Sequence, residues 1–222
     1  ALALQAARTM PHAEITLFDA RAAEFDVSAD PRTLALSIGS VQQLQRLGAW
    51  PAQAAQPITT VHVSQAPPTW NAEAAVRLRA VDEGVPMLGA VLAYGPLTTT
   101  LQRAWEAEAA RAPRRLHTHF GSAVAALKPL AGGVEVDAGI AESFDLVVVA
   151  EGGVFADQVR KAVVRDYAQT AWVGSVTLEG ATPGMAFERF TRHGPAALLP
   201  LRPGSDGSVR AALVWCVPST DD

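Results

Sequence analysis

The segment Asp145–Gly153, DLVVVAEGG, decides the predicted fold, because it joins an unbroken apolar run to a carboxylate and two glycines. An apolar run of this length is typical of a strand that is buried on both faces of a parallel sheet. Ligands of open α/β sheets bind at the carboxyl ends of the strands, where Glu151 could accept hydrogen bonds and Gly152 would allow a close approach. A plain turn that happens to carry Glu151 is the alternative.

The composition favours a folded protein without a nucleic-acid partner. The chain has 222 residues, of which 49% are hydrophobic and 18% are charged, and its net charge is −4. These values indicate one sizeable core or two small ones rather than disorder. The negative charge and the lack of a Lys/Arg run count against binding to nucleic acid.

Cysteine usage and hydropathy limit the remaining classes. Cys216 is the single cysteine, so it cannot form an intrachain disulfide, and its apolar surroundings predict a buried thiol in a strand. One Cys and five scattered His do not match the spacing of a metal site. No apolar segment reaches the roughly 20 residues that span a bilayer, and the first residues predict no signal peptide. We expect a cytoplasmic protein, with peripheral contact with the inner membrane left open.

The N-terminal residues predict the second half of a βαβ unit. Residues 1–10, ALALQAARTM, begin like the middle of a helix, without a cap or an initiator Met, which suggests a fragment. Residues 14–20, EITLFDA, predict a strand that ends near Asp19. In dinucleotide-binding folds an acid at this position accepts hydrogen bonds from a ribose. A turn cap is the alternative for Asp19.

A longer helix is predicted from Asp30–Pro31 to Gly48. Asp can cap a helix, Pro fits its first turn, and apolar residues then recur every three or four positions. Arg32 would lie in the first turn, where the helix dipole disfavours a cation. A cofactor phosphate beside Arg32 would resolve this conflict, and a surface arginine without a role is the alternative.

Two kinds of pattern alternate along the chain. Residues 1–56 and 90–164 have the pattern of parallel α/β structure, with a helix over 95–113 and a hairpin turn at Gly132–Gly133. Residues 57–89 and 165–222 predict antiparallel strands between Gly/Pro turns. We therefore predict an α/β fold, α+β overall. It would combine a discontinuous Rossmann-like parallel sheet with an antiparallel-sheet domain for substrate.

Several blocks of the sequence resemble, in the same order, the ubiquinone-biosynthesis FAD-dependent hydroxylases, which are aromatic monooxygenases. The blocks lie within residues 18–50, 86–97, 145–153 and 166–216. ERFTRHGPAALLPL at 188–201 is the most specific of them. The resemblance implies that FAD lies across the Rossmann-like domain, and that the substrate ring sits between the flavin and the antiparallel sheet.

The resemblance also implies roles for four cofactor-binding residues. It places Asp19 on the adenosine ribose and Arg32 near the flavin cofactor. Glu151 and Gly152 match the family's Asp-Gly motif, which serves FAD and the pyridine-nucleotide step. Glu151 departs from the usual Asp and reaches one methylene further, so its geometry is open.

Two segments of the family are absent from the 222 residues: the G-x-G-x-x-G motif and a downstream Gly-Asp segment. The glycine motif places backbone N–H groups against the pyrophosphate. We therefore expect an incomplete Rossmann-like sheet without its first strand. We also expect that this chain alone binds FAD weakly or not at all, and that it is inactive.

The implied reaction is hydroxylation of a polyprenylated phenol through a flavin C4a-hydroperoxide, with O2 and with NAD(P)H as electron donor. Leu199 and Pro200 are expected on the substrate-facing wall, because such a pocket needs apolar lining. His193 either faces the ring or lies in an exposed turn. The prenyl tail would need an apolar groove or a partner surface, such as another ubiquinone-biosynthesis protein.

Two alternatives stay open. The complete protein could be another flavoenzyme of the same fold, such as a dehydrogenase or a halogenase. It could also be a non-catalytic accessory lobe of a quinone-synthesis assembly.

Overall fold

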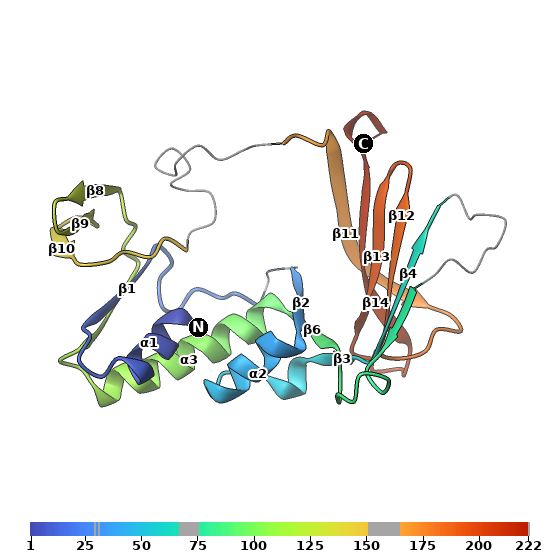
Figure 1. Ribbon diagram of the computed structural model, residues 1–222, viewed down its shortest axis with the longest axis horizontal. Helices are drawn as coiled ribbons and strands as arrows, with labels where there is room; N and C mark the ends of the chain where they lie inside the picture. Colours follow the sequence, from blue (N-terminus) through green and yellow to red (C-terminus); the bar gives the residue numbers. More distant parts are fainter. Residues whose placement is uncertain (29, 31, 67–75, 151–164, 222) are drawn as a thin grey trace. The chain divides into compact units, whose positions relative to one another are not determined.

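The computed structural model describes residues 1–28, 30, 32–66, 76–150 and 165–221. It has the mixed α/β structure that the sequence predicts, and it divides into two compact units (Figure 1). The sheet unit comprises residue 1 with residues 27–104 and 167–222, and the small unit comprises residues 2–26 and 105–166. The boundary falls within helix α3, Tyr94–Arg111.

The units group the chain differently from the predicted domains. Residues 27–56 and 90–104, which the sequence places in the Rossmann-like domain, belong to the sheet unit. The assignment of cofactor and substrate to particular domains stays a prediction.

The sheet unit is built on a six-stranded sheet with the order β11-β14-β13-β12-β4-β5. Its strands are β4 Thr60–Gln65, β5 Val76–Arg79, β11 Gln169–Leu178, β12 Met185–Thr191, β13 Gly194–Leu201 and β14 Val209–Pro218. The predicted antiparallel pairing of β4 with β5 is confirmed, and β11, β14, β13 and β12 are antiparallel in turn. β12 pairs with β4 in parallel, which the turn pattern did not predict.

A second, three-stranded sheet of the sheet unit corrects the start of the helix that was predicted from Asp30–Pro31 to Gly48. Its strands are β2 Thr33–Ser37, β3 Gln56–Ile58 and β6 Gly89–Ala93, in the antiparallel order β2-β6-β3. Helix α2 begins only at Ile38 and ends at Arg46. Ser37 is its N-cap, and the Ser37 side chain accepts a hydrogen bond from the Ser40 N–H. The predicted start at Asp30–Pro31 is therefore wrong, because the first residues of the segment pair with β6 instead.

Two buried clusters hold the sheet unit together. Leu44 of α2, Leu92 of β6 and Leu97 of α3 form one cluster, which joins both helices to the three-stranded sheet. Ile58, Val91 and Ala186 form the other, against which Val61, Leu199 and Leu201 pack. The second cluster therefore ties one face of the six-stranded sheet to β3 and β6.

The small unit contains the predicted helix and strand at the N-terminus. Helix α1, Leu2–Thr9, precedes β1, Ile15–Asp19, which pairs in parallel with β7, Leu116–Phe120. The Arg115 side chain donates hydrogen bonds to the carbonyls of Ala7 and Ala13, at the end of α1 and just before β1. Both predicted elements, α1 and β1, are confirmed.

A three-stranded antiparallel sheet completes the described secondary structure of the small unit. Its strands are β8 Ala126–Leu130, β9 Gly133–Asp137 and β10 Ala141–Phe144. The hairpin turn predicted at Gly132–Gly133 is confirmed, with Ala131 and Gly132 between β8 and β9. Among the described helices, none has the length and apolar character that crossing a bilayer requires.

The strand predicted for DLVVVA is wrong in the described residues. Residues 146–150 have no regular secondary structure, and Leu146 is 77% exposed, Val148 58% and Val149 47%. A strand forms only where a neighbouring strand supplies hydrogen-bond partners, and in the described chain β1 and β7 pair only with each other. Apolar composition alone therefore does not make this segment a strand.

Candidate cofactor site

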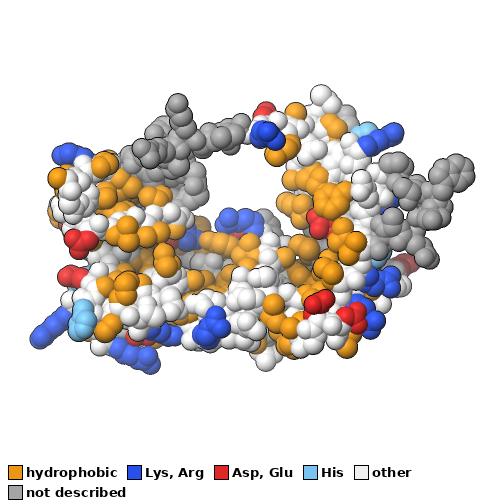
Figure 2. Space-filling model, viewed as in Figure 1, with side chains coloured by type: hydrophobic (Ala, Val, Ile, Leu, Met, Phe, Trp, Pro, Cys, Tyr) orange, Lys and Arg blue, Asp and Glu red, His pale blue; other side chains and the backbone are white. Residues whose placement is uncertain are grey.

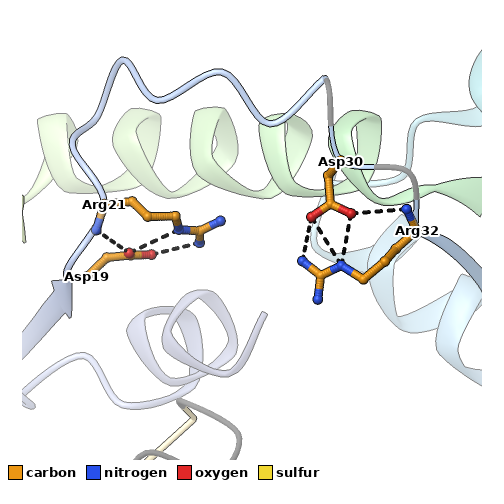
Figure 3. Close-up of polar contacts among 4 residues, drawn as sticks. All are labelled: Asp19, Arg21, Asp30 and Arg32. Atoms are coloured by element: carbon orange, nitrogen blue, oxygen red, sulfur yellow. Dashed lines mark hydrogen bonds and ion pairs between the residues drawn. The ribbon is translucent and has the colours of Figure 1, made fainter.

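The same local arrangement of an aspartate and an arginine occurs in each unit. In Asp19-Ala20-Arg21 and in Asp30-Pro31-Arg32, the arginine stands two residues after the acid. In both, the backbone N–H of the arginine donates to the aspartate Oδ1, and its guanidinium donates to the same carboxylate (Figure 3). We call each arrangement an Asp-x-Arg fork.

The first fork places Asp19 at the carboxyl end of β1 in the small unit. Its Oδ1 accepts the Arg21 backbone N–H at 2.8 Å and Nε–H at 3.1 Å, and its Oδ2 accepts Nη2–H at 2.9 Å. The hydrogen bonds from the Arg21 side chain hold the pKa of Asp19 below its usual range, although partial burial opposes them. Asp19 is therefore an ionised acceptor at neutral pH, and it also makes the turn cap that was its alternative role.

The chemistry of this carboxylate fits a ribose hydroxyl. A carboxylate oxygen can accept two hydrogen bonds, and Oδ2 accepts one from Arg21. The Asp19 side chain is 27% exposed, so a ligand hydroxyl can reach it. An ionised acid at the carboxyl end of a parallel strand is the arrangement that dinucleotide-binding folds use for ribose.

The second fork corrects the interpretation of Arg32. Arg32 comes just before strand β2 and is not in the first turn of a helix, so the predicted conflict with a helix dipole does not exist. The hydrogen bonds from its guanidinium to Asp30 raise the pKa of Arg32 above its ordinary value. The guanidinium carbon also lies 4.2 Å from the centre of the Tyr94 ring, in a cation–π contact.

The predicted cofactor residues lie in different parts of the chain. Asp19 belongs to the small unit and Arg32 to the sheet unit, and each is described within its own unit. Glu151 and Gly152 lie outside the described residues. The convergence of these side chains on one cofactor stays a prediction.

The residues predicted to face the substrate all belong to one hairpin of the six-stranded sheet. Leu199 and Pro200 are neighbours in β13, so their side chains point to opposite faces of the sheet. Leu199 packs against the cluster of Ile58, Val91 and Ala186, and Pro200 is buried. One pocket wall can therefore take Leu199 or Pro200 but not both.

The remaining residues of interest in this sheet are His193 and Cys216. His193 lies in the exposed turn between β12 and β13, and its Nε2 accepts a hydrogen bond from Arg192 Nε at 2.8 Å. This location agrees with the alternative of an exposed turn residue. Cys216 is a free, half-buried cysteine in β14, less buried than the apolar run predicts.

Part of the sheet's surface is apolar. Trp172 of β11 and Trp215 of β14 stand directly opposite each other, and they are 53% and 49% exposed. Hydrophobic side chains are visible on the strands at the right of the view in Figure 2.

Solved structures of flavoenzymes share this architecture. PqsL of Pseudomonas aeruginosa, solved with 2-aminobenzoylacetate, is 15% identical and superimposes with a TM-score of 0.66 over 99% of this chain and 58% of its own. HpxO of Klebsiella pneumoniae, solved with FAD and uric acid, is 16% identical with a TM-score of 0.55, over 90% of this chain and 49% of its own. The chain has the fold of the FAD-dependent monooxygenases.

A third structure with this FAD-dependent monooxygenase fold is 2,6-dihydroxypyridine-3-hydroxylase from Arthrobacter nicotinovorans. It is 14% identical, with a TM-score of 0.58 over 90% of this chain and 49% of its own. The chain thus spans only about half of the length of the structures that it matches. No protein-family model matches the chain.

The sequence patterns did not identify the residues that hold the side chains of Asp19 and Arg32 in place. Arg21 and Asp30 could have been found, because the Asp-x-Arg spacing occurs at both positions. Tyr94 could not, since nothing in the sequence pattern links the start of α3 to the residue before β2.

Proposed function

We propose that the complete protein is an FAD-dependent aromatic hydroxylase of ubiquinone biosynthesis, similar to 2-octaprenyl-6-methoxyphenol hydroxylase. The monooxygenase fold and the sequence blocks that resemble this family support the proposal. The observation that carries it is Asp19, held as an ionised acceptor at the carboxyl end of β1.

Each candidate residue has a defined task in this proposal. Asp19 accepts hydrogen bonds from the adenosine ribose, and Arg32 donates to an anionic part of the cofactor. Glu151 and Gly152 take the place of the family's Asp-Gly motif, which contributes to FAD binding and to the pyridine-nucleotide step. FAD, when bound, supplies the oxygen chemistry, and the chain's own residues bind it, orient it and exclude water.

The substrate side of the proposal is a polyprenylated phenol that lies against the six-stranded sheet. Leu199 or Pro200 supplies apolar lining, according to which face of β13 the ring meets. NAD(P)H is the electron donor and O2 the oxidant. Other ubiquinone-biosynthesis proteins, or peripheral contact with the membrane, would receive the prenyl tail.

The cofactor role of Asp19 can be tested on the complete protein by titration with FAD. Loss of a hydrogen bond to a charged group typically costs about 1.5–3 kcal/mol, so we expect Asp19→Ala to weaken FAD binding roughly 10- to 100-fold. Asp137→Ala is the matched control, because Asp137 also ends a strand and accepts a nearby backbone N–H, that of Gly139 at 3.0 Å. It should leave FAD affinity unchanged.

The reaction itself is tested by incubating the complete, FAD-loaded protein with a prenylated phenol, NAD(P)H and O2. Formation of a hydroxylated product supports the proposal. Failure to bind FAD would overturn it and favour an accessory role, whereas FAD binding without hydroxylation would favour another flavoenzyme activity. Titration of the 222-residue chain should show weak FAD binding or none, because its sequence has no G-x-G-x-x-G motif.

A further inference from the structure

The Arg32 side chain is fixed from two directions within the sheet unit. Its Nε and Nη2 donate to the Asp30 carboxylate, with Nε 2.9 Å from Oδ1, and its guanidinium lies over the ring of Tyr94. Asp30 therefore determines where one edge of the guanidinium points, while the Tyr94 ring centre lies 4.2 Å from its central carbon. The Nη1 side is directed away from Asp30 (Figure 3).

Tyr94 is itself held in place by the backbone. It is the first residue of α3, and its N–H donates to the carbonyl of Arg32 at 2.9 Å. The next residue, Gly95, lies against the backbone of Val27 and Ser28, so closely that a Cβ there would be 2.9 Å from the Val27 oxygen. Val27 and Ser28 are therefore packed onto the start of α3.

We propose that Tyr94 is a positioning residue for Arg32, and that it presents the exposed side of the guanidinium to the anionic part of the cofactor. This inference rests on the proposed role of Arg32 in FAD binding. Arginine has a long side chain that loses much rotamer freedom when it binds a ligand. A guanidinium already held by a ring and a carboxylate has less freedom to lose, although the Arg32 side chain remains 63% exposed.

The Tyr94 side chain acts on Arg32 through its ring face and through a hydrogen bond, and we assign the positioning to the ring face. Tyr94→Phe retains a ring face, whereas Tyr94→Leu removes it and leaves an apolar side chain. A cation–π contact at an exposed site corresponds to about a two- to fivefold change in an equilibrium constant. We expect Tyr94→Leu to weaken FAD binding by the complete protein two- to fivefold, and Tyr94→Phe to remain within twofold of the wild type.

A double-mutant cycle separates positioning from a general effect on the fold. If Tyr94 acts through Arg32, then Tyr94→Leu should have no further effect on FAD affinity when Arg32→Gln is already present. A purely structural role would give the same loss in both backgrounds. Thermal unfolding of each variant checks the fold, and Tyr94→Met replaces Tyr94→Leu if the latter does not fold.

The outcomes distinguish this inference from the proposed function. If Arg32→Gln weakens FAD binding but Tyr94→Leu does not, or if the two effects add, the inference is overturned and the role of Arg32 stands. If Tyr94→Phe loses as much as Tyr94→Leu, the ring is not what positions Arg32, and the inference is also overturned. If Arg32→Gln leaves FAD affinity unchanged, the proposed role of Arg32 fails, and the inference fails with it.

Discussion

Replacement of Gly194 by alanine should destabilise the six-stranded sheet strongly. Gly194 begins β13 directly after the turn at Arg192 and His193, and its φ is +141°, a conformation that residues with a side chain rarely adopt. A Cβ at this position would lie 2.6 Å from the carbonyl oxygen of Cys216 and 3.1 Å from the Cys216 Cβ. Because both contacts belong to β14, relief requires β13 to move away from the strand with which it pairs.

The expected cost combines two physical terms. Holding a residue with a side chain at such a φ costs roughly 1–3 kcal/mol. Overpacking against a neighbouring strand typically costs another 1–3 kcal/mol. We therefore expect Gly194→Ala to lower the free energy of unfolding by about 3 kcal/mol, provided that the strands shift enough to relieve part of the overlap.

Two other glycines of the sheet unit separate these terms. Gly207 has a φ of +80° but open space around a Cβ, so Gly207→Ala should cost only the backbone term, about 1 kcal/mol. Gly174 lies in β11 with open space and without a positive φ, so Gly174→Ala should stay within about 0.5 kcal/mol of the wild type. Urea unfolding can be followed by the fluorescence of the half-exposed Trp172 and Trp215, together with circular dichroism. A cost for Gly194→Ala no larger than that for Gly207→Ala would refute the argument from close packing.

Two further predictions concern a helix cap and a titrating carboxylate. Ser37→Ala should lower the free energy of unfolding in urea by about 1 kcal/mol, because the Ser37 Oγ accepts the Ser40 N–H at the start of α2. Ser37→Asp can form the same cap and should retain most of this stability. If Ser37→Asp and Ser37→Ala lose the same amount, the cap is contradicted. Because its folded pKa is lowered, Asp19 contributes stability that is complete above its unfolded pKa of about 3.9 and is lost as the pH falls through the folded value. Unfolding measured between about pH 2 and 6 should show this loss in the wild type and not in Asp19→Asn, which keeps an acceptor for the turn. Because the Asp19 and Arg21 side chains are partly exposed, the stability lost by the wild type should be about 0.5 kcal/mol. Identical pH profiles for the two proteins would contradict the lowered pKa of Asp19.

The elements that sequence predicted correctly are those in which only one period fits. The helix over 95–113 and the strand at 14–20 are of this kind, and both are present as α3 and β1. Residues 33–37, TLALS, fit both a helical and an alternating pattern, since Leu34 and Leu36 are two apart and Leu34 and Ile38 four apart. Pairing with β6 decides between them, and a local pattern does not contain that information.

The candidate site was predictable to a similar extent. Asp19 and Arg32 were singled out by their positions at a strand end and beside an Asp-Pro, and both make well-defined ion pairs. The predicted conflict between Arg32 and a helix dipole is wrong, because α2 begins only at Ile38. The contact of Arg32 with Tyr94 joins residues far apart in the sequence and follows from tertiary packing alone.

The two Asp-x-Arg forks have the same local geometry but present different groups to a ligand. In the first, the Asp19 side chain is 27% exposed and that of Arg21 39%, so the acid remains accessible while the arginine keeps it ionised. In the second, Asp30 is 23% exposed and Arg32 63%, so the arginine is the accessible partner. Each fork pairs one carboxylate with one guanidinium and is close to neutral overall, so we expect neither to attract a charged ligand strongly from a distance. The same local fork therefore exposes a hydrogen-bond acceptor in the small unit and a hydrogen-bond donor in the sheet unit.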